Sequence, residues 1–373
     1  MASSDVVVIG GGVVGAACAR ALAHRALKVT VFDDGGHQGI ATEVAGGMLA
    51  PLAEMKRDDP LLSLSVRARD LYTNLVPALE EATGIEIGLW TEGILQLAFS
   101  DDDANRLKSA IAWQRQLGFN SDWLDVEELT ERCPGINPEA VGAMHAPQDG
   151  VLRPTLLRQA LLQDAKQHGA TIHEGTKIEG VRIERNHVTG VHTNGEIVPA
   201  ETVLLAAGCW TKLISGLPRP VAVEPIRGQM AVMAWPQDEP PAIVYAGAGY
   251  VMHRDGEAMA GSTMEHVGFD PNPTPNGLET IRNAMLRVYP ALQGVTIKRH
   301  VAGLRPVSAD GRPLIGPDPA VQGLWYATGH GRNGVLLAGL TGEILAQEVT
   351  HEATEDSSVN GPNCMDPGRF WRF

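Results

Sequence analysis

The sequence lacks several features that would indicate a disulfide-bonded, membrane-spanning or nucleic-acid-binding protein. Its 373 residues include only 4 cysteines, none with C-x-x-C spacing, so we expect reduced thiols rather than a disulfide framework or a zinc site. Lysine and arginine number 30 against 44 acidic residues, and the net charge of −14 argues against a nucleic-acid or anionic-membrane partner. No apolar run approaches the roughly 20 residues of a membrane-spanning helix.

The first residues also lack the basic segment and the long apolar segment of a signal peptide, because an apolar strand is predicted to begin at Asp5. We therefore expect a cytoplasmic protein. Hydrophobic residues make up 44% of the chain and charged residues 20%, as in ordinary globular proteins. The length predicts two or three domains.

Hydrophobic periodicity predicts an α/β fold. Residues 5–34 are expected to form a strand, a helix and a second strand, and residues 177–207 an antiparallel ribbon that leads into a buried strand. A further strand, glycine loop and helix are expected at 324–349. The spacing of apolar residues, together with proline and glycine at segment ends, predicts other helices over 64–84, 103–117, 152–170 and 277–289.

The most specific local signal is a GxGxxG motif formed by Gly10, Gly12 and Gly15, between a predicted strand at 6–9 and a predicted helix at 13–24. The first glycine permits a tight turn, the second lets the backbone approach a pyrophosphate, and the third lets the helix pack against the sheet. The helix N-terminus offers free N–H groups and a partial positive charge to phosphates. The motif therefore predicts a dinucleotide site, and the alternative is a glycine-rich turn without a ligand.

Asp33 ends the second predicted strand, where a carboxylate can accept hydrogen bonds from both ribose hydroxyls of a dinucleotide. An acid at this point favours FAD or NAD over NADP. Two further segments suit either a flavin site or a plain strand–turn–helix. They are a buried strand at 203–210 and a second glycine loop at 329–337, which opens an apolar helix. These residues alone leave the choice between FAD and NAD open.

Longer segments resemble the glycine oxidase branch of the D-amino-acid oxidase family, and the likeness runs in order over nearly the whole chain. They are TEVAGGMLAP (42–51), YVMHRDGEAMAGSTMEHVGFD (250–270), AGLRPVSADGRPLIG (302–316), GHGRNGVLL (329–337) and the closing DPGRF.

The resemblance implies a Rossmann-like FAD-binding domain made of separated segments, with an inserted β-rich substrate domain. Placed on this chain, the FAD-binding domain would comprise 1–85, 148–218 and 300–355, the substrate domain 86–147 and 219–299, and a C-terminal tail 356–373.

The resemblance also implies which residues contact FAD. In sequence order, they are Gly10, Gly12, Val13, Val14, Gly15, Asp33, Asp34, Ala41, Thr42, Gly46, Gly47, Met48, Ile178, Gly208, His330, Gly331, Arg332, Asn333, Gly334, Val335 and Leu336.

Arg305 matches the arginine that binds the substrate carboxylate in this family. A planar guanidinium suits the task because it donates two parallel hydrogen bonds to a carboxylate. Tyr250 would donate to the same carboxylate, and Arg332 would contact substrate or offset charge on the reduced flavin. Met48 and Met264 would form pliable pocket walls. Each also has an ordinary structural interpretation, as a surface arginine or as a core tyrosine or methionine.

The chain departs from the family pattern at three places. Ala41 and Thr42 stand where two hydroxyl residues are common, which puts one phosphate contact in question. Ala248 stands where a pocket histidine can occur, so the size of the substrate is left open. Gly303 stands where related sarcosine oxidases carry a flavin-linking cysteine, so we expect FAD to be bound non-covalently.

The implied reaction is oxidation of glycine and other small amines or D-amino acids by hydride transfer from Cα to flavin N5. Electrons would pass to O2, giving H2O2, ammonia and a 2-oxo acid, and the imine from glycine would be available for the thiazole of thiamine. We also expect a homo-oligomer. Two alternatives remain open: a D-amino-acid dehydrogenase that uses a quinone or another acceptor, and a non-catalytic flavoprotein.

No general base is required if the amine arrives deprotonated, because its lone pair then drives the departure of the hydride. We expect His330 to have a role in the flavin loop rather than to act as a base. No H-x-x-x-H pattern or carboxylate cluster predicts a metal site.

Replacing Gly12 by valine tests the predicted phosphate cradle. A branched side chain at this position should keep the backbone from approaching the pyrophosphate, so the purified Gly12→Val protein should be colourless. The absorbance spectrum of the purified variant measures this directly. A yellow variant with a full complement of flavin would refute the assignment.

Overall fold

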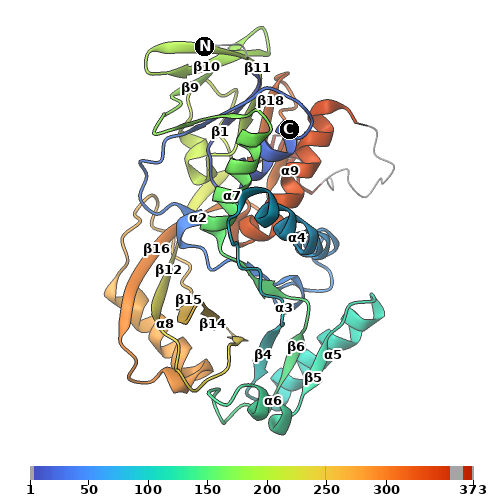
Figure 1. The fold of residues 1–373 in the computed structure, drawn as a ribbon, viewed down its shortest axis with the longest axis vertical. Helices are drawn as coiled ribbons and strands as arrows, with labels where there is room; N and C mark the ends of the chain where they lie inside the picture. Colours follow the sequence, from blue (N-terminus) through green and yellow to red (C-terminus); the bar gives the residue numbers. More distant parts are fainter. Residues whose placement is uncertain (1–3, 248, 353–363, 372–373) are drawn as a thin grey trace.

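The computed structural model describes residues 4–247, 249–352 and 364–371. Ala248 lies outside the described residues, and so do residues 356–363 and 372–373 of the predicted tail. Two large sheets form the body of the molecule, the first in the upper half of Figure 1 and the second in the lower half.

The first sheet carries the strand–helix–strand unit predicted near the N-terminus. β1 (Ser4–Ile9) lies in its middle and pairs in parallel with β2 (Val29–Asp33) and β11 (Glu196–Leu205). Almost all of β1 is buried, which explains its continuous apolar run. The other strands are β8 (Thr171–Glu174), β9 (Gly180–Glu184), β10 (His187–Thr193), β17 (Leu314–Pro317) and β18 (Leu324–Thr328), in the order β17-β18-β11-β1-β2-β8, with β10 and β9 extending from β11.

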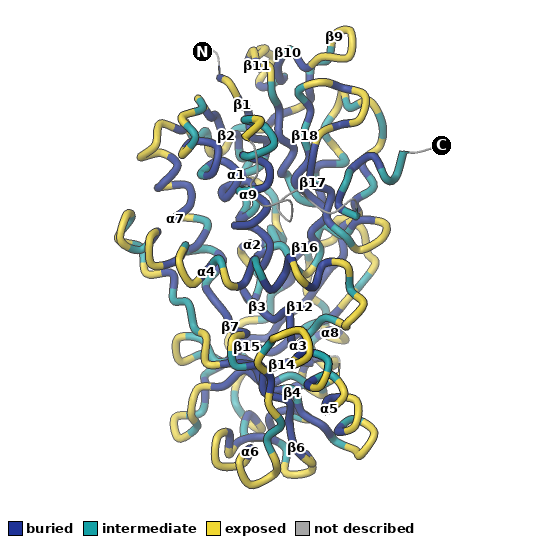
Figure 2. Tube along the Cα trace, turned by 90° about the vertical axis from the view of Figure 1, so that its right-hand side faces the viewer, coloured by how far each residue is buried: buried dark blue, intermediate teal, exposed yellow. Residues whose placement is uncertain are grey.

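Four helices pack together beside this sheet (Figure 1). α1 (Val13–Ala23) lies against α7 (Pro154–Gln167) and α9 (Gly334–Thr350), and α4 (Leu62–Thr83) packs on α7 and α9. A Cβ atom at Gly342 of α9 would lie 2.6 Å from the carbonyl oxygen of Ala17, so only glycine fits where α1 and α9 meet. Figure 2 shows the buried residues gathered inside these layers, with exposed residues mainly in the loops.

The second sheet is mostly antiparallel. Its longest strands, β16 (Ile297–Ser308) and β12 (Val223–Ala234), pair over nearly their whole length. α8 (Pro275–Val288) covers one face, and α5 (Asp101–Gln116) and α6 (Val126–Arg132) lie at the end far from the first sheet. The remaining strands are β15 (Glu257–Gly261), β14 (Gly249–Arg254), β13 (Ile243–Ala246), β4 (Ile94–Ala98), β6 (Gly142–Ala146) and β5 (Asp122–Leu124), in the order β16-β12-β15-β14-β13-β4-β6-β5.

Several short elements lie outside the two large sheets and the longer helices. They are the strand pair β3 (Met48–Leu49) and β7 (Gly150–Val151), the helices α2 (Ala41–Val44) and α3 (Pro51–Glu54), and the 3-10 turns η1 (Gly208–Leu213), η2 (Pro290–Leu292), η3 (Gly331–Asn333) and η4 (Pro367–Phe370). Several of them carry residues that were predicted to contact FAD.

The predicted α/β class and all the predicted helices are confirmed. The helix expected over 152–170 begins with Pro154 as its first residue and ends at Gln167, just before Gly169. The predicted domain boundaries stay a prediction. β16 crosses the boundary placed at residue 300 and pairs with β12 on both sides of it.

Within the described ranges, no helix is both long enough and apolar enough to cross a membrane.

All four cysteines are free thiols, and three of them are buried. Burial raises the pKa of Cys133 and of Cys209 to about 12, so both thiols stay protonated at neutral pH.

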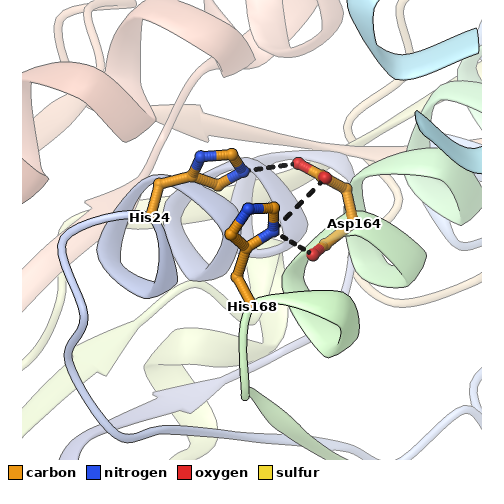
Figure 3. Close-up of side chains that lie close together, drawn as sticks. All are labelled: His24, Asp164 and His168. Carbon is orange, nitrogen blue, oxygen red and sulfur yellow. Dashed lines mark hydrogen bonds and ion pairs between the residues drawn. The ribbon is translucent and has the colours of Figure 1, made fainter. Parts of the chain in front are cut away.

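A carboxylate ties the end of α1 to the end of α7 (Figure 3). Asp164 of α7 is 2% exposed, and its Oδ2 lies 2.6 Å from Arg20 Nε and 2.7 Å from His24 Nε2. His168 Nδ1 lies 3.4 Å from the other carboxylate oxygen, and the two imidazole rings stack with centroids 3.7 Å apart. Burial acts to raise the pKa of Asp164, but the hydrogen bond from His24 and the charge of Arg20 outweigh it, and the pKa is lowered.

Asp164→Asn should therefore destabilise the fold. Loss of the charged acceptor should reduce the free energy of unfolding by about 1.5–3 kcal/mol at pH 7, while Asp58→Asn, at an exposed position, should change little. Because the pKa is lowered in the folded state, this stabilisation is present above pH ~4 and is lost as the pH falls further. Urea denaturation at several pH values checks this, and equal stability of variant and wild type at pH 7 would contradict it.

Candidate functional site

A cavity of about 620 Å³ runs from the first sheet to the second. One part of it lies at the carboxyl ends of the parallel strands, where Gly10 follows β1, Asp34 follows β2, Ala206 follows β11 and His330 follows β18. The carboxyl-terminal edge of a parallel sheet is where α/β folds bind ligands. The other part is lined by residues of β12, β14 and β16.

The glycine motif shapes the cavity wall at the start of α1. Gly10 has a φ of +103°, and a Cβ atom there would lie 2.6 Å from the carbonyl oxygen of Ala206. A Cβ at Gly15 would lie 1.9 Å from the carbonyl oxygen of Gly10, so this glycine serves the helix–strand contact and does not line the cavity. A Cβ at Gly12 would approach only the Thr42 hydroxyl, at 3.4 Å, so Gly12 leaves the helix N-terminus open toward the cavity.

Asp33 lies where the motif predicts, at the end of β2 and in the cavity wall. Its Oδ2 accepts a hydrogen bond from Arg158 Nη2 at 2.8 Å, and Arg158 also donates to the carbonyl oxygen of Gly11. Arg158 belongs to α7 and was not predicted. It ties α7 to the glycine loop and fixes the carboxylate beside the cavity.

The segment from Ala41 to Met48 lines the middle of the cavity. The hydroxyl of Thr42 accepts a hydrogen bond from the backbone N–H of Val13 at 3.1 Å, so the one hydroxyl retained here contacts the first turn of α1. Gly47 has a φ of +86°, and a Cβ atom there would lie 1.9 Å from the carbonyl oxygen of Leu152. The chain therefore passes too close to β7 and α7 for any other residue.

The second glycine loop closes the cavity from the α9 side. Residues 330–336 all line it, and α9 begins at Gly334 without a side-chain cap. His330 is 2% exposed, and its Nε2 lies 3.1 Å from the hydroxyl of Thr341. Burial lowers the pKa of His330 to about 4, so the imidazole is neutral at pH 7 and anchors the loop to α9.

Arg305 of β16 reaches the cavity from the second sheet. Nη1 donates to the carbonyl oxygen of Thr263 at 2.9 Å, and Nη2 donates to the hydroxyl of Ser262 at 2.9 Å. A Cβ atom at Gly228 would lie 2.0–2.2 Å from the guanidinium, which therefore rests directly on the glycine backbone. Among the described residues, Arg305 forms no ion pair, so its charge faces the cavity with neutral partners only.

Tyr250 of β14 is 7% exposed and lines the same end of the cavity. Its hydroxyl lies 3.5 Å from the sulfur of Met230, which is a weak acceptor. Burial raises the pKa of Tyr250, so the hydroxyl keeps its proton at neutral and mildly alkaline pH. Met48 lines the cavity, whereas Met264 does not: it is 52% exposed and its sulfur lies 3.4 Å from Arg305 Nη1.

Arg332 of the η3 turn differs from Arg305 because it has an acidic partner. Its Nη2 donates to Glu54 Oε1 at 2.7 Å, and Glu54 is the last residue of α3. Burial raises the pKa of Glu54, although the charges of Arg332 and Arg305 act against this. Two guanidinium groups and one carboxylate thus lie at the same end of the cavity.

Of the residues predicted to contact cofactor or substrate, the structure brings all but Gly15 and Met264 to the wall of this one cavity. Sequence reasoning missed several others, namely Glu54, Arg158, Trp210, Gly228 and Ser262. A glycine inside a strand often marks a close approach, and this signal was available at Gly228.

One group of side chains among the described residues has metal-ligand geometry: His24, Asp164 and His168 (Figure 3). None of them lines the cavity, and the carboxylate already pairs with Arg20. The prediction that the protein has no metal site stays a prediction.

Comparison with known proteins gives a family match and close relatives. A family described as FAD dependent oxidoreductase, abbreviated DAO, matches residues 5–348. The glycine oxidase of Pseudomonas putida is 33% identical over 93% of this chain and 95% of its own. The bifunctional protein ThiO/ThiG of Trichormus variabilis is 33% identical over 94% of this chain, which spans 53% of that protein. The crystal structure of glycine oxidase from Geobacillus kaustophilus superposes with a TM-score of 0.91 at 29% identity, covering 99% of both chains.

Gly228→Ala tests the placement of Arg305. The added methyl group would occupy the position of the guanidinium, so the guanidinium must move while the backbone of β12 can stay. Acetate, a minimal carboxylate, should bind at least tenfold more weakly, a loss of about 1.4 kcal/mol, as measured by calorimetry. The exposed Gly36→Ala serves as the control, and unchanged acetate binding in Gly228→Ala would contradict this account.

Proposed function

The chain belongs to the DAO family of FAD-dependent oxidoreductases, and from this premise we propose that it oxidises the amine of glycine and of other small amines or D-amino acids. The observation that carries the proposal is the guanidinium of Arg305. It faces the cavity, and all its hydrogen-bond partners among the described residues are neutral. A partly buried cation of this kind is matched by the carboxylate of a ligand.

The cavity suits FAD along its whole length. The open N-terminus of α1 at Gly12 fits a pyrophosphate, and Asp33 fits a ribose. The start of α9, at residues 331–336, would hold the flavin end, where a helix N-terminus favours negative charge. When bound, FAD accepts the two electrons that amine oxidation releases. A Cβ at Gly303 would lie 3.0 Å from Cβ of Val44, so there is little room for a side chain that could be linked to the flavin. Non-covalent binding of FAD stays a prediction.

Arg305 would orient the substrate through its carboxylate. Ser262 and Thr263 each take one N–H of the guanidinium, which leaves other N–H groups for two parallel bonds to a ligand. Two parallel hydrogen bonds fix the orientation of the substrate as well as the position of its carboxylate. A point charge would fix only the position. Tyr250 would add a third hydrogen bond, because the thioether of Met230 holds its hydroxyl proton only weakly.

The substrate would react as the free amine. His330 and Glu54 line the same cavity as Arg305, and both are engaged elsewhere: His330 is neutral and bonded to Thr341, and Glu54 is paired with Arg332. A neutral amine needs neither of them, because its own lone pair assists removal of the α-hydrogen.

The proposal extends to the products. Glycine, water and O2 would give glyoxylate, ammonia and H2O2, and the intermediate imine could be passed to synthesis of the thiamine thiazole. Likeness to a protein named ThiO/ThiG and to named glycine oxidases supports this substrate. Action in the cytoplasm and assembly as a homo-oligomer stay predictions.

A peroxide assay in air across glycine, sarcosine, and D- and L-amino acids of increasing size tests the function. We expect H2O2 with glycine, sarcosine and small D-amino acids. Bleaching of the flavin by an amine without release of H2O2 would instead support a dehydrogenase with another electron acceptor. No bleaching by any amine under anaerobic conditions would overturn the proposal.

Arg305→Ala should weaken substrate capture by about 2–5 kcal/mol, the range for losing one partner of a buried charge pair. The effect should appear as a lower kcat/KM for glycine, while the visible absorbance of bound flavin is retained. Arg305→Lys keeps the charge but not the paired donors, so it should recover only part of the loss. A KM for glycine equal to that of wild type in Arg305→Ala would remove the carboxylate clamp from the mechanism.

A further inference from the structure

Glu54 places a negative charge among the cationic groups of the substrate end. It lines the cavity together with Arg305, Arg332 and Tyr250, and its side chain is 19% exposed. Its carboxylate lies 2.7 Å from Arg332 and acts electrostatically on Arg305 as well. No role for this residue follows from the carboxylate clamp or from the binding of FAD.

The two arginines consequently differ in what they offer a ligand. Arg305 has only neutral hydrogen-bond partners among the described residues, whereas Arg332 is held by Glu54. The net charge of the three groups is that of one cation. One carboxylate of a ligand neutralises this charge. A second carboxylate would meet the guanidinium of Arg332, which is already paired, and the carboxylate of Glu54, which would repel it.

We infer that Glu54 is a specificity-determining residue that restricts the site to monocarboxylate amines by neutralising Arg332. This inference rests on the proposed function for the class of substrate, because it concerns the same site. The excluded class is dicarboxylate amines, such as iminodiacetate, in which the second carboxylate lies a few atoms from the first.

The restriction is a property of binding, so it can be measured without turnover. Glutarate separates its carboxylates by three atoms, as iminodiacetate does, and pentanoate replaces one carboxylate by a methyl group. Neither has an amine, so neither can be oxidised. Calorimetry with FAD-loaded protein at pH 8.5 gives the ratio of the two binding constants. Because neither ligand is oxidised, the ratio tests the role of Glu54 even if the protein does not oxidise amines.

In Glu54→Gln, the shape of the side chain is kept and its charge is removed. We expect the preference for glutarate over pentanoate to rise at least tenfold relative to wild type. In the turnover assay, kcat/KM for iminodiacetate should rise by a similar factor relative to N-ethylglycine, in which a methyl group replaces the second carboxylate. Adding Arg332→Gln to Glu54→Gln should abolish the gain, because the released guanidinium is the group that would bind the second carboxylate.

The single variant Arg332→Gln provides an independent test if Glu54→Gln does not fold. It leaves the carboxylate of Glu54 without its partner, so the preference for glutarate over pentanoate should fall below that of wild type. A ratio that is unchanged in Glu54→Gln, or one that rises in Arg332→Gln, would overturn the inference.

Discussion

The guanidinium of Arg305 rests on the backbone of Gly228 and is held there by a carbonyl oxygen and a hydroxyl. Taking a cation out of water is costly unless a counter-charge is supplied, and among the described residues no carboxylate pairs with this one. The register of β12 and β16 creates the arrangement, because Gly228 lies opposite Gly303 and Arg305 lies two residues further along β16, on the same face. A side chain at position 228 would occupy the space that the guanidinium fills.

The two ends of the cavity are built by different means. At the first sheet, glycine and helix N-termini present backbone groups, and the only charged side chain that the sequence motif requires is Asp33. At the second sheet, long side chains from β14, β16, the η3 turn and α3 converge. Glu54 of α3 offsets the charge of Arg332, and among the described residues the charge of Arg305 stays unpaired. Shape therefore dominates where a large cofactor would lie, and charge dominates where a small substrate would lie.

The local part of this organisation could be predicted from sequence. The strand, glycine loop and helix at the N-terminus are specified within some 30 residues, and α7 and α9 carry proline and glycine signals at their ends. All but two of the residues that the resemblance implied line the cavity, although they make up less than half of its wall. Gly228 and Glu54 were missed because their importance arises from tertiary contacts: Glu54 pairs with a residue 278 positions away, and nothing in its neighbourhood signals this. Met264 was placed in the pocket by resemblance, yet it lies on the exposed side of Arg305.

The central claim is that the ligand carboxylate, through Arg305, orients the amine for oxidation. Anaerobic reduction of the bound flavin by glycine and by methylamine, followed by stopped-flow absorbance, tests it most directly, because the two amines differ only in the carboxylate. We predict that glycine at equal free-amine concentration reduces the flavin at least a hundredfold faster. Equal rates for the two amines would contradict the account.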